Sequence, residues 1–113
     1  KWAEDSGMTF TLHTDAPVTP ISPLESIQIA VDRKTKDGDT LGEHQRLTRD
    51  EAFKKMTADA AKLNHTEQSE GTIKAGKVAD FVVLNQNPLD THTTLNNSLI
   101  EMTICNGQVV YKK

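Results

Sequence analysis

The sequence predicts a mixed α+β fold in which a strand and two helices come first and a group of strands follows. Three observations support this class. Apolar residues alternate with threonine over residues 8–12, helix-capping signals occur at residues 22 and 48, and short apolar runs separated by turn residues follow Gly71. Alternation with period two is typical of strands, whereas apolar spacings of three and four are typical of helices.

The first expected element is a strand over Met8–Leu12, which reads Met-Thr-Phe-Thr-Leu. Pro17 and Pro20 follow it, and proline interrupts both ladders and helix interiors. The strand therefore delivers His13 and Asp15 to a proline-rich loop. No parallel neighbour for this strand is apparent in the sequence, and unpaired strand backbone is unstable. We therefore expect that this chain is one piece of a larger fold.

The second expected element is a helix that begins after Ser22. This serine can cap the helix, Pro23 suits the first helical position, and Glu25 lies three residues after the cap. The helix should end between residues 34 and 36, before Gly38. Its apolar face comprises Leu24, Ile27, Ala30 and Val31.

A further helix should begin after Thr48, because Glu51 completes a second capping box. We expect it to run to about residue 63, with a break near Thr57. Its apolar positions are Ala52, Phe53, Met56, Ala60 and Leu63.

Three or four strands should follow. Gly71–Lys77 is expected to be a short extended piece, and Phe81–Leu84 a strand that is apolar on both faces and hence buried. Leu99–Cys105 should pair with Gln108–Tyr111 through the two-residue turn Asn106-Gly107, which is a strong hairpin signal. Cys105, at the end of the first of these two strands, is expected to be an unreactive, packed side chain.

Composition excludes several classes of function. The 113 residues carry a net charge of -3 without a Lys/Arg stripe, which argues against nucleic-acid binding. No apolar run approaches the ~20 residues of a membrane span. A single cysteine excludes an internal disulfide and fits a reducing compartment, so we expect a cytoplasmic protein.

Two stretches resemble a known family. The first is Phe-Thr-Leu-His-Thr-Asp-Ala-Pro-Val-Thr-Pro at residues 10–20, followed by Ala-Val-Asp-Arg at 30–33. The second is Gly-Thr-Ile-Lys-Ala-Gly-Lys-Val-Ala-Asp-Phe-Val-Val-Leu at 71–84, followed by Asn87-Pro88 and by Gly-Gln-Val-Val-Tyr at 107–111. Together they resemble the carboxyl-terminal end of metal-dependent amidohydrolases, in the branch of exoenzyme-like amidases and deformylases.

The resemblance implies a fold, a division of the chain and a chemistry. Residues 1–70 would be the tail of a (β/α)8 barrel, with Met8–Leu12 as its eighth strand, and residues 71–113 would be part of a β-sandwich. A divalent metal, with zinc expected, would serve hydrolysis of a carbon–nitrogen bond in a small-molecule amide. The remaining ligands and the rest of the barrel would come from other parts of the parent chain, and the piece alone would be inactive and would hold no metal.

Asp15 is the expected catalytic residue. The resemblance makes it a contact of the metal or of the attacking water and the acceptor of the water's proton. From spacing alone, a loop aspartate that caps Val18 or Thr19 would be favoured, and the motif reverses that preference. His13 lies two residues earlier and points to the same face. The two could be a ligand pair, but we expect His13 to hydrogen-bond on the substrate side.

The other polar residues receive structural interpretations. His44, His65 and His92 are expected on the surface, without the spacing of metal ligands. Arg33 is either a solvated helix-end cation or, by resemblance, an anchor of a loop. Asp80 should bond to a turn at residues 76–77, whose Gly-Lys pair lacks the spacing of a phosphate-binding loop.

A second hypothesis is a non-catalytic binding or assembly module derived from such an enzyme's tail. Its apolar faces would be buried in a homo-oligomer, for which an open sheet edge and an unpaired strand are suitable.

Overall fold

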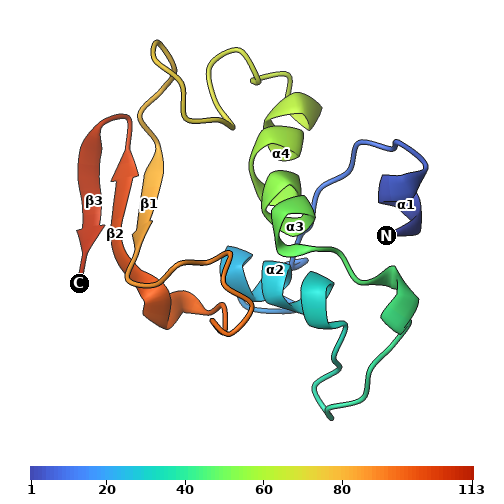
Figure 1. Cartoon of the computed structure of the whole chain (residues 1–113). Helices are drawn as coiled ribbons and strands as arrows, with labels where there is room; N and C mark the ends of the chain where they lie inside the picture. Colours follow the sequence, from blue (N-terminus) through green and yellow to red (C-terminus); the bar gives the residue numbers. More distant parts are fainter.

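A computed structural model describes residues 1–113 and shows helices and a sheet that lie side by side (Figure 1). The helices are α1 (Trp2–Asp5), α2 (Pro23–Asp32), α3 (Arg49–Met56) and α4 (Ala58–Leu63), with short 3-10 turns at Glu43–Gln45 and Asn97–Leu99. The strands are β1 (Phe81–Leu84), β2 (Ile100–Cys105) and β3 (Gln108–Lys112). None of the helices has the length and apolar character that crossing a bilayer requires.

Both predicted helix starts are confirmed. Ser22 caps α2 by accepting a hydrogen bond from the amide of Glu25 at 3.4 Å. Thr48 and Glu51 form a reciprocal capping box at the start of α3. The predicted break at Thr57 separates α3 from α4, but α2 ends at Asp32, earlier than predicted, because Arg33 takes a left-handed conformation.

The predicted hairpin is also confirmed. The sheet is antiparallel with the order β1-β2-β3. Asn106 and Gly107 both have positive φ, as a type I′ turn requires. Gly71–Lys77 forms no strand, so the sheet has three strands.

The prediction that β1 is buried on both faces is wrong for this chain. The exposed fractions of Val82 and Val83 are 51% and 43%. The reason is that α2 packs on α3 and α3 on α4, whereas no helix packs extensively along the sheet. The predicted packing of Cys105 is wrong for the same reason, since this residue is exposed.

The predicted strand at Met8–Leu12 is absent from the structure. These residues have no regular secondary structure, and no backbone–backbone hydrogen bond involves residues 9–14. A strand exists only with a partner, and the single sheet of this chain lies elsewhere.

The core lies between α2, α3 and the segment that leads into β2. Gln28 accepts a hydrogen bond from the amide of Leu95 at 2.8 Å, and Ser22 donates to Asn97 at 3.1 Å, so polar bonds join this segment to α2. The buried apolar residues of this core are Leu24, Ile27, Leu47, Ala52, Leu95 and Leu99.

Candidate active site

The predicted site residues line a groove between residues 11–20 and one face of α2. The groove has a volume of about 610 Å³ and includes both His13 and Asp15. Helical spacing places its α2 wall on one face, since residues three or four apart are neighbours. The lining side chains from this wall are Ser22, Glu25, Ser26, Ile29, Ala30 and Arg33. We call this the Asp15 groove.

The loop that carries Asp15 is held by local hydrogen bonds. Asp15 itself has a positive φ of 53° and its carbonyl accepts from the amide of Val18 at 2.9 Å. The hydroxyl of Thr19 donates to the carbonyl of Thr14. Aspartate tolerates the left-handed conformation better than most residues, so the residue type suits the turn.

The Asp15 carboxylate accepts no hydrogen bond and forms no ion pair within the chain. The expected alternative, a side chain that caps Val18 or Thr19, is not seen, because the carbonyl of Asp15 takes the bond from Val18. The side chain is exposed at the edge of the groove. Its oxygens are therefore available to a water molecule, a metal or a substrate.

The hydrogen bond of His13 determines what its ring can do. Its Nδ1 accepts from the amide of Asp15 at 3.1 Å. A neutral imidazole that accepts at one nitrogen carries its proton on the other. Nε2 is then a donor, whereas a histidine that binds a metal through one nitrogen usually donates from the other. The geometry thus favours a hydrogen-bonding role.

Arg33 anchors the loop after α2. Its Nε donates to the carbonyl of Leu41 at 3.0 Å, and its own carbonyl accepts from the amide of Leu41 at 2.9 Å. Both bonds span the loop at residues 34–41. Of the two interpretations of Arg33, loop anchoring is the one that the structure shows.

The side chains of His13 and Asp15 are of the types that bind metals, but the Asp15 groove contains too few of them for a metal site. Imidazole and carboxylate are ordinary ligands of zinc, yet a zinc site uses at least three protein ligands. The chain contains no group of three or more His, Cys, Asp or Glu side chains that could hold a metal ion. His44, His65 and His92 are exposed, as predicted. A metal beside Asp15 would need donors from outside these 113 residues.

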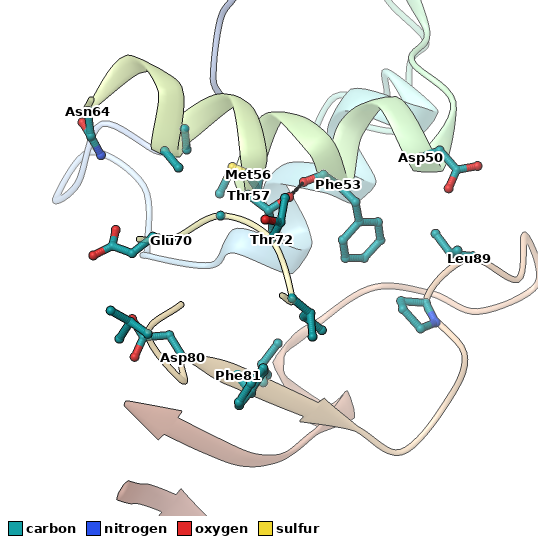
Figure 2. Close-up of a pocket in the computed structure, with 17 residues that line it drawn as sticks. Asp50, Phe53, Met56, Thr57, Asn64, Glu70, Thr72, Asp80, Phe81 and Leu89 are labelled. Carbon is teal, nitrogen blue, oxygen red and sulfur yellow. Dashed lines mark hydrogen bonds between the residues drawn. The ribbon is translucent and has the colours of Figure 1, made fainter. Parts of the chain in front are cut away.

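A second groove lies between α3–α4 and β1. Its volume is about 760 Å³, and Figure 2 shows Phe53 and Met56 on the helix side with Phe81 and Leu89 opposite them. The side chains that line it include no histidine, cysteine, lysine or arginine. It therefore offers a mainly apolar surface, whose polar side chains are carboxylates, an amide and the hydroxyls of Thr57 and Thr72.

Asp80, at the rim of this second groove, does not bond to residues 76–77 as predicted. Its Oδ1 accepts from the amide of Asn106 at 2.6 Å. The carboxylate therefore holds the β2–β3 turn against the start of β1, which is a structural role.

A buried charge cluster on α3 and α4 was not predicted from the sequence. Lys55 has an exposed fraction of 1%, and its Nζ lies 2.7 Å from Asp59 Oδ2 and pairs with Glu4. Nζ also lies 4.4 Å from the centre of the Phe10 ring. We call these four residues the Lys55 cluster. The four-residue spacing of Lys55 and Asp59 was a signal for their pairing, but it did not indicate their burial.

The pairing decides the charge state of both groups. Burial alone would lower the pKa of Lys55, but hydrogen bonds to Asp59 and Glu4 outweigh it and hold the pKa above the usual value. Burial alone would raise the pKa of Asp59, but the hydrogen bond from Lys55 outweighs it and holds that pKa below the usual value. Both groups are therefore charged near neutral pH.

The family model and the curated relatives that this chain matches agree with one another. The amidohydrolase family model matches residues 1–111. The chain is 38% identical to the Bacillus subtilis protein YtcJ over 104 residues, which cover 88% of this chain and 20% of that protein. It is 33% identical to the N-substituted formamide deformylase of Arthrobacter pascens over 110 residues, which cover 96% of this chain and 20% of that enzyme.

The fold is found in a solved structure as well. The crystal structure of an amidohydrolase from Thermotoga maritima matches 97% of this chain with a TM-score of 0.70 at 24% identity, over 24% of its own length. The chain spans about a fifth of the length of the curated relatives above. The family model nevertheless covers nearly every residue, and the chain belongs to the amidohydrolase family.

Proposed function

We propose that the protein to which this chain contributes hydrolyses a carbon–nitrogen bond, other than a peptide bond, in a small-molecule amide. The observation that carries the proposal is a free carboxylate at Asp15 in a groove, within a chain that belongs to the amidohydrolase family. The similarity to a formamide deformylase supports an amide as the substrate class.

In this proposal residues 1–70 belong to a (β/α)8 barrel and residues 71–113 to a flanking β-sandwich. The unpaired segment Met8–Leu12 becomes the eighth barrel strand once neighbouring strands supply hydrogen-bond partners. Asp15 then lies at the carboxyl end of that strand, where barrel enzymes carry their catalytic groups.

The chemistry assigned to this chain is proton transfer. A divalent metal, for which we propose zinc, would lower the pKa of a water molecule that it binds toward about 7. Asp15 would accept a proton from the water while the oxygen of that water attacks the substrate carbonyl. Asp15 would then give this proton to the leaving amine. His13 would donate a hydrogen bond from Nε2 to a substrate oxygen. Asp15 would also be this chain's contribution to the metal's ligands.

The test uses the complete gene product that contains this chain. Amine release is measured with a panel of N-substituted formamides and N-acyl amines, before and after a chelator and zinc are added. We expect Asp15→Asn to lower kcat by about 10²–10⁴-fold. Asp37→Asn is the matched control, since Asp37 is also an exposed loop aspartate without a side-chain bond.

Two outcomes would contradict the proposal in different ways. A folded wild-type protein that releases no amine from any member of the panel removes the proposed reaction. Wild-type activity that survives in Asp15→Asn removes the proposed role of this carboxylate.

A second candidate is a non-catalytic module that self-associates. Exposed apolar side chains on the sheet favour it, with exposed fractions of 51% for Val82 and 62% for Val110. Sedimentation of this chain tests the second candidate, because a stable monomer would contradict it. Amine release by the complete gene product tests the first candidate, because this module must not turn over amides.

A further inference from the structure

Lys55 is a buried cation that contacts the segment leading to Asp15. Besides pairing with Asp59 and Glu4, its ammonium lies over the Phe10 ring at 4.4 Å, within the range of a cation–π interaction. Its backbone carbonyl accepts a hydrogen bond from the hydroxyl of Thr11 at 2.8 Å. Residue 55 thus holds two consecutive residues, four and five positions before Asp15.

These contacts matter because they are the polar contacts that join residues 9–14 to the helices, whereas the other side-chain hydrogen bonds of this segment, from Asp15 to His13 and from Thr19 to Thr14, are short-range. No backbone–backbone hydrogen bond involves residues 9–14. In the proposed barrel, neighbouring strands would add backbone bonds along Met8–Leu12, and the contacts of Lys55 would join that strand to the helices.

Phe10 packs against the core, but apolar packing is not directional and permits sliding. The contacts of residue 55 with this segment are directional, since they are a hydrogen bond from Thr11 to its backbone carbonyl and the position of its ammonium over the face of the Phe10 ring. The two ion pairs, with Glu4 and Asp59, hold that ammonium in place.

A buried lysine at residue 55 destabilises the fold unless its charge has a specific role. Burying a charge is strongly unfavourable unless partners compensate it, and an apolar residue of similar volume often serves packing equally well. Here both carboxylates lie on elements that must be joined, Glu4 on α1 and Asp59 on α4. The cluster therefore fixes α1, α4 and residues 10–11 relative to one another.

We propose that Lys55 is a positioning residue of the site. The Lys55 cluster fixes the position of residues 10–13 relative to the helices and thereby places the Asp15 carboxylate in its groove. This inference rests on the proposed function, because it assigns to Lys55 an effect on the reaction of Asp15.

The experiment measures kcat and KM of Lys55→Met in the complete gene product, per folded molecule. Methionine keeps most of the volume and removes the charge. Lys62→Met is the matched control, because Lys62 also lies near Asp59, at 3.8 Å, but its side chain is 54% exposed. A misplacement of about 1 Å can cost about 10²-fold in rate. We expect Lys55→Met to lower kcat about 10–100-fold with KM nearly unchanged, and Lys62→Met to leave both constants unchanged.

A combined variant shows whether the loss runs through Asp15. In the Asp15→Asn background we expect Lys55→Met to have little further effect, because the misplaced group is already inactive. Equal fold losses in both backgrounds would overturn the inference, and so would a wild-type kcat in folded Lys55→Met. A failure of the proposed function is distinct, because then Asp15→Asn itself leaves the activity intact.

A second pair of variants tests the positioning role if Lys55→Met does not fold. Phe10→Leu removes the ring under the ammonium, and Phe53→Leu makes the same change at another half-buried phenylalanine on the same core. We expect Phe10→Leu to lower kcat several-fold more than Phe53→Leu. Equal values for the two variants would refute the positioning role.

Discussion

The contact of Gly71 with α4 gives the sharpest prediction for stability. An alanine Cβ at Gly71 would lie 2.5 Å from the Cβ of Ala61 and 3.1 Å from the carbonyl oxygen of Thr57. Gly76, five positions later, also has a positive φ, but a Cβ there meets nothing within 4 Å. Both glycines therefore need a positive φ, but only Gly71 also lies so close to α4 that a Cβ would not fit.

The magnitudes follow from this difference. A left-handed conformation costs a residue with a Cβ about 1–2 kcal/mol, which applies to both Gly71→Ala and Gly76→Ala. Overpacking against the helix adds about 1–3 kcal/mol at Gly71 alone. Any gain from a less flexible unfolded chain is common to both variants and cancels in their comparison. Gly71→Ala should thus lower the free energy of unfolding by about 2–5 kcal/mol in total.

The assay is equilibrium urea unfolding of the 113-residue chain, followed by far-UV circular dichroism. The double variant Gly71→Ala/Ala61→Gly should be more stable than the sum of its single variants predicts, because it removes the nearest atom. If Gly71→Ala costs no more than Gly76→Ala, the packing of residue 71 on α4 is refuted.

Three further predictions concern caps, core and acid stability. Thr48→Ala should lower the free energy of unfolding by about 1 kcal/mol, since it removes the capping box of α3, and urea unfolding measures this. Ile27→Ala should cost about 2–5 kcal/mol, whereas Ile29→Ala, at a side chain that is 58% exposed, should change stability by less than about 1 kcal/mol; similar values would contradict the core assignment. Because the folded pKa of Asp59 is lowered by Lys55, its contribution is present above the unfolded pKa and is lost as pH falls, so the urea midpoints of wild type and Asp59→Asn should converge below about pH 4. A gap that persists into acid would contradict this pairing.

Local signals predicted local structure well. The caps at Ser22 and Thr48 and the turn at Asn106-Gly107 are confirmed because each depends on hydrogen bonds among residues close in sequence. The position of Asp15 and His13 in one loop was likewise predicted from the prolines that follow them, but the position of this loop beside α2 was not predicted. Their proposed roles came from the resemblance and remain predictions.

Features that depend on distant partners were not predicted. Met8–Leu12 has the alternation of a strand, but pairing requires a second strand that the sequence pattern cannot supply. The apolar character of β1 indicated burial, yet burial depends on what covers the sheet. The burial of Lys55 was not predicted, because its partners lie on α1 and at Phe10, which only folding brings near.

The sequence by itself determined membership in the amidohydrolase family, the helix starts and the hairpin, because motifs and caps are properties of neighbouring residues. Tertiary structure alone decided that the Asp15 carboxylate is free, that His13 accepts at Nδ1, and that a lysine is buried behind the site. The physical reason is that burial and charge pairing are set by atoms far apart in the chain, and their energies exist only once the chain has folded.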